Sequence, residues 1–436
     1  MRRAHRSRAG HGGGTRRRLA SRAVAAGIAT AAVIIAAGCS SSGTSGASGT
    51  SGASGSGKSV LKIGFPVNLT GTDTQYPDAL AGAQAAIRGI NARGGIKGHP
   101  VQLDWCDVQS NVDTAEACAR KMVSDGDIAI TGDNTNYGPQ ITAILQAANI
   151  PDVAGSPTVA SQFSSPIYFP RSSGGIGTFD AGAYYGIHIA NMKSFAFVGV
   201  QIPIVATLAA STQAAVIKNG GVWKGTVEMP VTTTSFTPYV AAAAAKHASI
   251  VYLAMSGQQV AEFALAAEAA GYSFHTYVTA VAYPNSVLQT LGPTTPFGEA
   301  MLFGGDLPPN NATSQFPILQ QFNADIAAEA KSGDKYAGSS YSSPAQLEAW
   351  YAVHVVQVIA NSIPGSSITA ATMLQALRTE KDVSLGLQPP WTPDAEGPAG
   401  YGHINNWDEY MEHLVNGQLA LAYSQPFSVE SFVAGG

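Results

Sequence analysis

The chain has 436 residues, with 24 basic and 28 acidic side chains and a formal net charge of −4. Eight of the basic residues lie within residues 1–38, which hold no acid, so the rest of the chain carries 16 basic against 28 acidic residues, a net charge of −12. An acidic body of this kind argues against nucleic acid and anionic membrane as partners. Its length exceeds what one hydrophobic core usually serves and predicts two lobes.

Residues 1–38 are typical of a secretory signal. Eight arginines within residues 1–22 precede an uncharged run over 23–38, which is short for a membrane span. Ala36, Ala37 and Gly38 stand directly before Cys39 and resemble a lipobox, where a bacterial cysteine is acylated and becomes the mature N-terminus. The alternative is a plain cleaved signal with a free thiol. A twin-arginine-like run at 16–19 leaves the export route open.

Residues 39–58 are predicted to form a flexible tether. Between Ser40 and Gly57 only Ser, Gly, Thr and Ala occur, and the hexad GTSGAS appears at 43–48 and again at 49–54. A segment without charge or apolar bulk behaves as a flexible coil. We therefore expect a protein anchored by the lipidated Cys39 to the outer face of the cell membrane.

The first part of the folded body shows strands alternating with helices. Strands are expected over 61–67, 100–106, 127–133 and 150–156, and helices over 76–95, 111–124 and 137–148. Cys106 ends the second strand, and Cys118 lies on the apolar stripe of the following helix. A disulfide between them is geometrically reasonable and suits an extracytoplasmic protein; two buried thiols are the alternative.

The alternation restarts in the second part. Helices are expected over 179–191, 204–218, 237–247 and 258–270, and strands over 194–200, 222–231, 249–255 and 276–282. Helices over 315–331, 344–361 and 370–378 follow, and the tail from Val383 reads as irregular with two short strands. This α/β pattern predicts parallel sheets covered on both faces and right-handed crossovers.

Ligands of such sheets bind outside the carboxyl ends of the strands. The segments at those ends are 68–76, 133–138, 156–161, 201–205, 256–259 and 283–286. They are rich in hydroxyls and amides, and the chain has no HExxH, GxSxG or P-loop motif and no Cys/His cluster with metal spacing. We expect a polar cleft that holds a solute, with no catalysis, metal or cofactor.

Several segments resemble the branched-chain amino-acid-binding proteins, which are type I periplasmic binding proteins of ABC importers. They are LKIGFPVNLTG, GAQAAIRGINARGGIKGHPVQL, QSNVDTAEACARKMV and IPDVAGSPT, and the similarity extends from Leu61 to about Phe427. The resemblance implies two Rossmann-like lobes joined by three crossovers. We expect residues 59–175 and 303–362 in the first lobe, and residues 176–302 and 363–436 in the second.

The resemblance also implies where a ligand would bind. The aromatic residue after the first strand corresponds to Tyr76, the polar start of the third helix to residues 134–136, and the pair after the fourth strand to Ser156 and Thr158. The candidate ligand-binding residues are Asn68, Tyr76, Asn134, Thr135, Asn136, Ser156, Thr158, Gly174, Gln201, Ile202, Ser256 and Tyr283. We expect Ile202, Ile204 and Tyr283 to cover an apolar part of the ligand.

The chain departs from amino-acid-binding relatives where they neutralise the ligand's ammonium. The crossover at 172–177 and the loop at 280–286 contain no acid, and an unpaired buried ammonium is costly. The expected ligand is therefore a carboxylate or a neutral polar molecule with an apolar part, rather than a simple amino acid. The favoured function is that of a monomeric solute-binding protein serving an ABC importer permease; the alternative is a surface sensor of the same fold.

Overall fold

The structure, a computed structural model, describes residues 58–132, 135–283, 285–291 and 296–434. The predicted signal, Cys39, nearly all of the tether and Asn134 lie outside the described residues. Within these ranges, none of the helices combines the length and the apolar character that a membrane crossing requires.

The first sheet has five parallel strands in the order β2-β1-β3-β4-β5. The strands are β1 (Leu61–Val67), β2 (Val101–Asp107), β3 (Ala129–Thr131), β4 (Asp152–Val153) and β5 (Tyr168–Phe169). The helices between them are α1 (Pro77–Ala92), α2 (Val112–Asp125), α3 (Gly138–Ala148) and α4 (Ala160–Phe163). The sequence predicted β1 to the residue and missed the two-residue β5 and the four-residue α4, which are too short to show a period.

The second sheet follows the order β12-β11-β10-β9-β8-β6-β7, with β13 paired to β11. Its strands are β6 (Ser194–Val200), β7 (Val222–Met229), β8 (Ile250–Ala254), β9 (His275–Thr279), β10 (Met301–Gly305), β11 (Asp408–Val415), β12 (Gln418–Leu421) and β13 (Phe427–Ser428). The helices before β10 are α5 (Gly174–Tyr184), which continues as a π-helix (Tyr185–Ile189), α6 (Pro203–Lys218), α7 (Thr237–Ala244), α8 (Gly257–Ala269), α9 (Asn285–Leu291) and α10 (Pro296–Glu299).

This sheet corrects two expectations. It is mixed rather than parallel, because β11 runs antiparallel to both β10 and β12, and the tail forms three strands where two were expected. The strand β10 was also missed, since a five-residue buried run ending in two glycines carries no alternation by which to recognise it. Its pairing with β9 places residues 301–305 in the second sheet.

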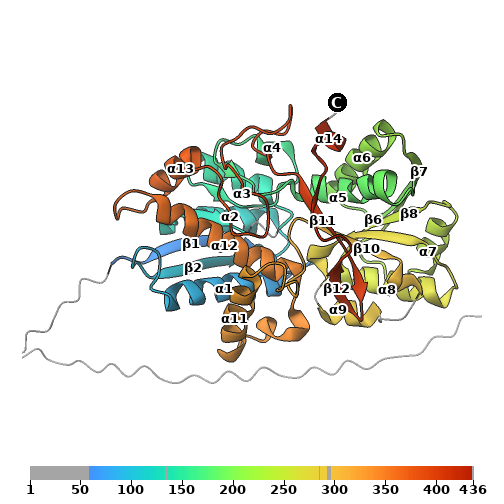
Figure 1. The fold of residues 1–436 in the computed structure, drawn as a ribbon, viewed down its shortest axis with the longest axis horizontal. Helices are drawn as coiled ribbons and strands as arrows, with labels where there is room; N and C mark the ends of the chain where they lie inside the picture. The colour runs from blue at the N-terminus through green and yellow to red at the C-terminus, as the bar shows by residue number, and fades with distance from the viewer. Residues whose placement is uncertain (1–57, 133–134, 284, 292–295, 435–436) are drawn as a thin grey trace, which may run out of the picture. The chain divides into compact units, whose positions relative to one another are not determined.

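The second sheet is buried on both faces, as predicted for the α/β class. Along β6, Phe195 and Phe197 belong to one core cluster and Ala196 and Val198 to another. Consecutive residues of a strand point to opposite faces, so each face has its own core. Figure 1 shows the blue-to-teal first sheet and the second sheet, green to yellow with β11 and β12 in red, in separate halves of the described fold, each with its own helices.

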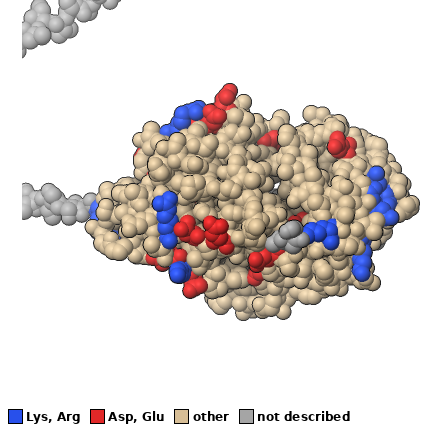
Figure 2. All heavy atoms as spheres, turned by 90° about the horizontal axis from the view of Figure 1, so that it is seen from above, with Lys and Arg blue, Asp and Glu red and all other residues tan. Residues whose placement is uncertain are grey.

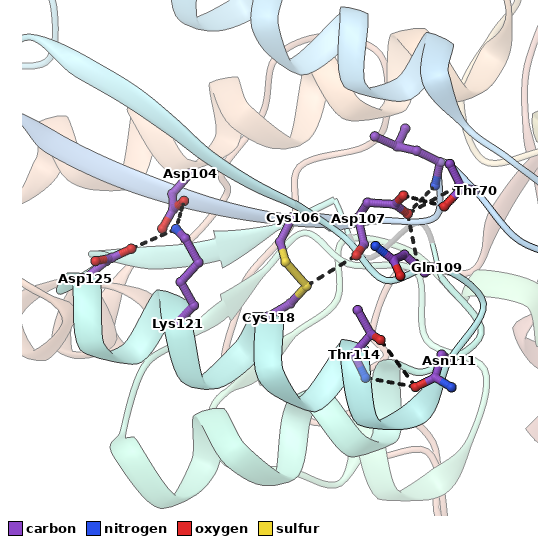
Figure 3. The surroundings of a disulfide bond; sticks show 11 residues. Thr70, Asp104, Cys106, Asp107, Gln109, Asn111, Thr114, Cys118, Lys121 and Asp125 are labelled. Atoms are coloured by element: carbon purple, nitrogen blue, oxygen red, sulfur yellow. Dashed lines mark hydrogen bonds and ion pairs between the residues drawn. A yellow bond between two sulfur atoms is a disulfide. The ribbon is translucent and has the colours of Figure 1, made fainter. Parts of the chain in front are cut away.

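The predicted disulfide is confirmed. Cys106 of β2 and Cys118 of α2 are bonded, with their Cα atoms 5.7 Å apart (Figure 3). The helix that carries Cys118 begins after Asn111, whose side chain accepts a hydrogen bond from the backbone N–H of Thr114 at 3.0 Å. A 12-residue separation and a capped helix start bring the two sulfurs together locally.

The chain passes between the two sheets three times, in the stretches 169–174, 305–318 and 391–404. After the second passage, α11 (Ile318–Lys331), α12 (Pro344–Ser362) and α13 (Ala370–Thr379) pack in the first core, together with Leu387 and Trp391. Ile404, Trp407 and α14 (Glu430–Ala434) pack with the second sheet. We therefore propose that the first lobe extends to about residue 391 and that β10 belongs to the second lobe.

A buried group of charged residues joins these crossovers. Arg171 of the first donates to Asp306 of the second at 2.7 Å, and the two side chains are only 2% and 4% exposed. A carboxylate oxygen of Glu348, on α12, lies 3.9 Å from the Arg171 guanidinium. Glu409, on β11 just after the third crossover, accepts from Ser173 at 2.6 Å. We call Arg171, Asp306, Glu348 and Glu409 the hinge cluster.

The hinge cluster contains three acids and one base. Full ionisation would leave excess negative charge in a dry interior, which is costly. Burial raises the pKa of Glu348 and of Glu409 well above their usual range, and Asp306 adds to both shifts. Burial therefore disfavours the charged form of both glutamates, whereas Arg171 and Asp306 form a direct ion pair.

Charged side chains are sparse elsewhere. Figure 2 shows one face of the molecule, on which acidic and basic residues are few and separated by wide uncharged areas. Such a surface presents no large patch of one sign on that face.

Arg171→Met is expected to lower the free energy of unfolding by about 3–5 kcal/mol, because it leaves the Asp306 carboxylate buried without its partner. Urea denaturation followed by circular dichroism measures the change. Arg378→Met, on the exposed side of α13, is the matched control and should change stability by no more than about 0.5 kcal/mol. The double variant Arg171→Met/Asp306→Leu should recover most of the loss; equal effects of Arg171→Met and the control would contradict this account.

Candidate functional site

A cavity of about 460 Å³ lies where the carboxyl ends of the strands of both sheets meet. Its first-lobe wall comes from the segments that follow β1, β3 and β4. Its second-lobe wall comes from the ends of β6, β8 and β9, from the segments that follow β6, β7 and β8, and from α5. This is the location that the sequence predicted from the topology of parallel sheets, and we call the cavity the cleft.

The two walls differ in chemistry. The first lobe contributes Thr72, Asp73, Thr74, Tyr76, Asn136 and Thr158. The second lobe contributes mainly apolar groups, among them Phe179, Val200, Ile202, Ile204, Leu208 and Met255. The polar side chains Thr233, Thr234, Ser256, Gln259, Glu262 and Thr279 surround that apolar wall. A molecule with a polar end and an apolar part fits such a surface.

Five of the candidate residues line the cleft, together with Ile204. They are Tyr76, Asn136, Thr158, Ile202 and Ser256. Asn136 donates through Nδ2 to Asp73 at 3.2 Å, and Thr158 donates through its hydroxyl to Gln162 at 3.0 Å. These bonds hold the polar groups of the first lobe in place before any ligand arrives.

Ser256 also caps the N-terminus of α8. Its hydroxyl oxygen accepts from the backbone N–H of Gln259 at 3.4 Å, and the Gln259 side chain in turn accepts from the Ser256 backbone at 3.2 Å. This capping box fixes the first turn of the helix, so two cleft residues also shape the element that carries them.

Other candidate residues lie outside the cleft wall. Asn68 is buried, where it donates to the carbonyl of Thr74 at 2.9 Å and accepts from the backbone of Ser110 at 2.7 Å. Tyr283 packs in the second core with its ring 5.6 Å from that of Phe303. Asn68 therefore shapes the loop that carries Tyr76, and Tyr283 supports the wall from behind.

Three more candidates are placed near the cleft but do not line it. Thr135 accepts from the backbone of Tyr137 at 3.2 Å, and Ser156 is exposed. Gln201 lines a neighbouring cavity and donates to Glu228 at 3.3 Å. Their contact with a ligand stays a prediction.

Gly174 does not line the cleft; it is where the first crossover packs against the segment that follows β4. Its φ is +58°, and a Cβ there would lie 2.1 Å from the carbonyl oxygen of Pro157. A side chain at this position is therefore strained and obstructed. A Cβ at Gly175 would instead lie 3.6 Å from Thr158 and 3.6 Å from Leu208, both of which line the cleft.

Two acids line the cleft that were not predicted from the sequence. Asp73 lies in the loop 68–76, which was singled out for its hydroxyls and amides, and Glu262 lies in the second turn of α8. The expectation of a cleft without an acid rested on the crossover and on the loop 280–286 alone. The place of Asp73 in the cleft could have been inferred from its position near Tyr76 in the same loop. The sequence around Glu262, in contrast, does not indicate the direction of its side chain.

The described part of the chain offers no metal site outside or inside the cleft. No group of three or more His, Cys, Asp or Glu residues there is arranged to hold a metal ion. A second cavity of about 560 Å³ lies near α9, α11 and the start of α12. Several of its polar side chains serve the chain itself, since Asn285 donates to the carbonyl of Ser339 at 3.1 Å and Asn310 donates to Ser342.

Comparison with known proteins gives one family. The sequence model of a family described as periplasmic binding protein matches residues 60–401. None of the curated proteins compared with the chain matches it in sequence.

Solved structures share the fold at low sequence identity. The fatty acid ABC transporter substrate-binding protein from Thermomonospora curvata is 16% identical with a TM-score of 0.71, covering 87% of this chain and 94% of that one. The branched-chain amino acid transporter substrate binding protein LivJ from Streptococcus pneumoniae, in complex with isoleucine, is 16% identical with a TM-score of 0.67, covering 85% and 99%. The leucine binding protein LivK from Thermotoga maritima is 14% identical with a TM-score of 0.66, covering 83% and 98%.

Gly174→Ala is expected to lower the free energy of unfolding by about 1–3 kcal/mol, because the new methyl group meets the Pro157 carbonyl in a left-handed backbone conformation. Gly175→Ala is the adjacent control, and its stability should stay within about 0.5 kcal/mol of the parent. Thermal and urea denaturation of both variants measure the difference. Equal stability of the two would show that the crossover is not constrained at Gly174.

Proposed function

Because the chain belongs to the periplasmic binding protein family, we propose that it captures a small molecule outside the cytoplasm and delivers it to the permease of an ABC importer. The observation that carries this proposal is the cleft, a cavity of about 460 Å³ whose walls come from both lobes. A solute that contacts both walls binds best when the lobes close on it. Closure around a solute is also what a permease could recognise.

The solute that we propose has a polar end and an apolar part. The polar end would lie against Tyr76, Asn136 and Thr158 of the first lobe, and the apolar part against Ile202 and neighbouring side chains of the second. Burial of the apolar part supplies most of the affinity, and hydrogen bonds to the polar end orient the solute.

The nature of the polar end needs revision from the sequence-based expectation. A carboxylate, or the carboxylate of a simple amino acid, would approach Asp73 and Glu262, both of which line the cleft. Like charges in a confined space destabilise each other. Of the expected alternatives, we therefore propose a polar end without negative charge.

We also propose that the protein is held at the outer face of the membrane through Cys39. The support is the basic and apolar signal over residues 1–38, the small residues before Cys39 and the Ser/Gly-rich tether after it. A tethered binding protein stays close to its permease, which raises its effective concentration there.

Cys39→Ala is expected to release the protein from the membrane fraction or to leave it unprocessed, since the thiol is the acylation site. Cell fractionation with immunoblotting, together with the mass of the mature N-terminal peptide, measures this. Ser40→Ala is the matched control and should remain membrane-bound. A Cys39→Ala protein that is processed and still membrane-bound would contradict the proposal that Cys39 carries the lipid anchor.

Ile204→Arg is expected to abolish solute binding, because it places a long charged side chain in the cleft. Ile217→Arg makes the same change on the same helix α6 at a position that is 56% exposed. Native mass spectrometry of the proteins as purified should show a small-molecule adduct on the parent and on Ile217→Arg but not on Ile204→Arg. An adduct on all three would place the site elsewhere.

Delivery needs its own test, since a sensor of the same fold would also bind a solute. The purified protein, reconstituted with its permease and ATPases in liposomes, is expected to support ATP-dependent uptake of the co-purified solute. Binding without uptake would favour the sensor.

A further inference from the structure

Two carboxylates line the cleft, one from each lobe. Asp73 lies in the loop between β1 and α1, and Glu262 lies on α8. Both side chains are partly buried. Asp73 receives its hydrogen bonds from neutral groups, the amide of Asn136 at 3.2 Å and the hydroxyl of Tyr137 at 3.1 Å.

Among the described residues of the cleft wall, no positive side chain accompanies these acids. Among the described residues that line the cleft there is no Lys, Arg or His. Arg171, in the hinge cluster, is not part of the wall, and its guanidinium is bound to Asp306 at 2.7 Å. The charge that the described wall presents to a solute is therefore negative only.

Tyr76 experiences a field of the same sign. Burial raises the pKa of its hydroxyl, and the nearby carboxyl groups of Asp78, Glu348 and Asp73 raise it further. The aromatic rings of Tyr76 and Phe179 both line the cleft. The face of such a ring attracts a cation, most strongly where water is excluded.

We propose, building on the function proposed above, that the solute carries a positively charged nitrogen group on an apolar body. The charged group lies by Asp73 and Glu262, and the body lies against the apolar wall that includes Ile202 and Leu208. Primary amines and quaternary ammonium compounds belong to this class. Asp73 and Glu262 are then the residues that determine specificity.

The same arrangement couples binding to closure. Moving the lobes together brings two like charges toward each other as water leaves the cleft, and their repulsion grows as the surroundings become less polar. A cation between the two carboxylates replaces their repulsion with two attractions. A neutral solute leaves the repulsion between the carboxylates unchanged, and an anion increases the total repulsion in the cleft. The closed form is therefore stabilised selectively by a cation.

The test uses matched compounds that differ only in the polar end. Amine, alcohol and carboxylate triplets are prepared on linear alkyl, cyclohexyl and phenylalkyl bodies, and the pool is offered to the ligand-free protein in affinity selection with mass spectrometry. We expect amines to be enriched at least tenfold over the alcohols and carboxylates of the same body. Calorimetry with the best amine and its matching alcohol then gives the affinities.

Two substitutions connect the preference to the acids. Asp73→Asn and Glu262→Gln should each weaken the amine at least tenfold and change the alcohol less than twofold. Glu268→Gln, also on α8 but outside the cleft wall, is the control and should change neither. Enrichment of carboxylates or alcohols over amines, or equal losses for amine and alcohol in the variants, would overturn the inference.

Failure of the proposed function has a different signature. If no compound of any charge is enriched on the parent, and the parent and Ile204→Arg carry the same adducts as purified, then the cleft binds no solute and both proposals fall. If compounds are enriched on the parent and lost on Ile204→Arg but show no preference for amines, solute binding stands and only the inference on charge is wrong.

Discussion

Arg171 and Asp306 meet where the first and second crossovers lie together, and neither side chain reaches solvent. A buried ion is stable only while its partner stays in place, so this pair fixes two of the three connecting segments to each other. Glu348 brings α12 of the first lobe to the same point, and Glu409 brings the strand that follows the third crossover. Every connection between the lobes therefore converges on one hinge cluster, in which two buried glutamates with raised pKa lie around the Arg171–Asp306 ion pair.

The shape of the cleft depends on the position of the hinge cluster. Gly174 lies three positions after Arg171, with its backbone against that of Pro157, and a Cβ at the next residue, Gly175, would meet Thr158 and Leu208 of the cleft wall. A shift at the hinge cluster would thus be transmitted to both walls. In a protein that must close on its solute, stiffness at the hinge restricts the relative motion of the lobes to a few modes.

The two lobes present different chemistry to the cleft because different elements of each lobe form its walls. The first sheet presents hydroxyls and amides at its carboxyl edge, and the second presents aliphatic side chains from β6 and α6 with a polar border. Asp73 and Glu262 place one negative charge on each wall. Hydrophobic burial can then supply affinity while charge supplies the discrimination between solutes. Apolar contacts distinguish solutes weakly, whereas the carboxylates of a confined cleft strongly disfavour solutes of negative charge.

The sequence by itself determined the features that local pattern encodes. The alternation of apolar residues predicted β1 and β6 to the residue, and the position of Cys118 on the apolar stripe of α2 predicted the disulfide with Cys106. The order of strands predicted five of the segments that line the cleft, but not the segment after β7. Only the tertiary structure decided the rest. The pairing of β10 with β9, the reversal of β11, the meeting of Arg171 with Asp306 across 135 positions of the chain and the direction of Glu262 into the cleft depend on contacts between distant segments. Such contacts leave no period in the sequence, because a side chain's neighbours in a packed core are set by how the elements dock rather than by the residues beside it.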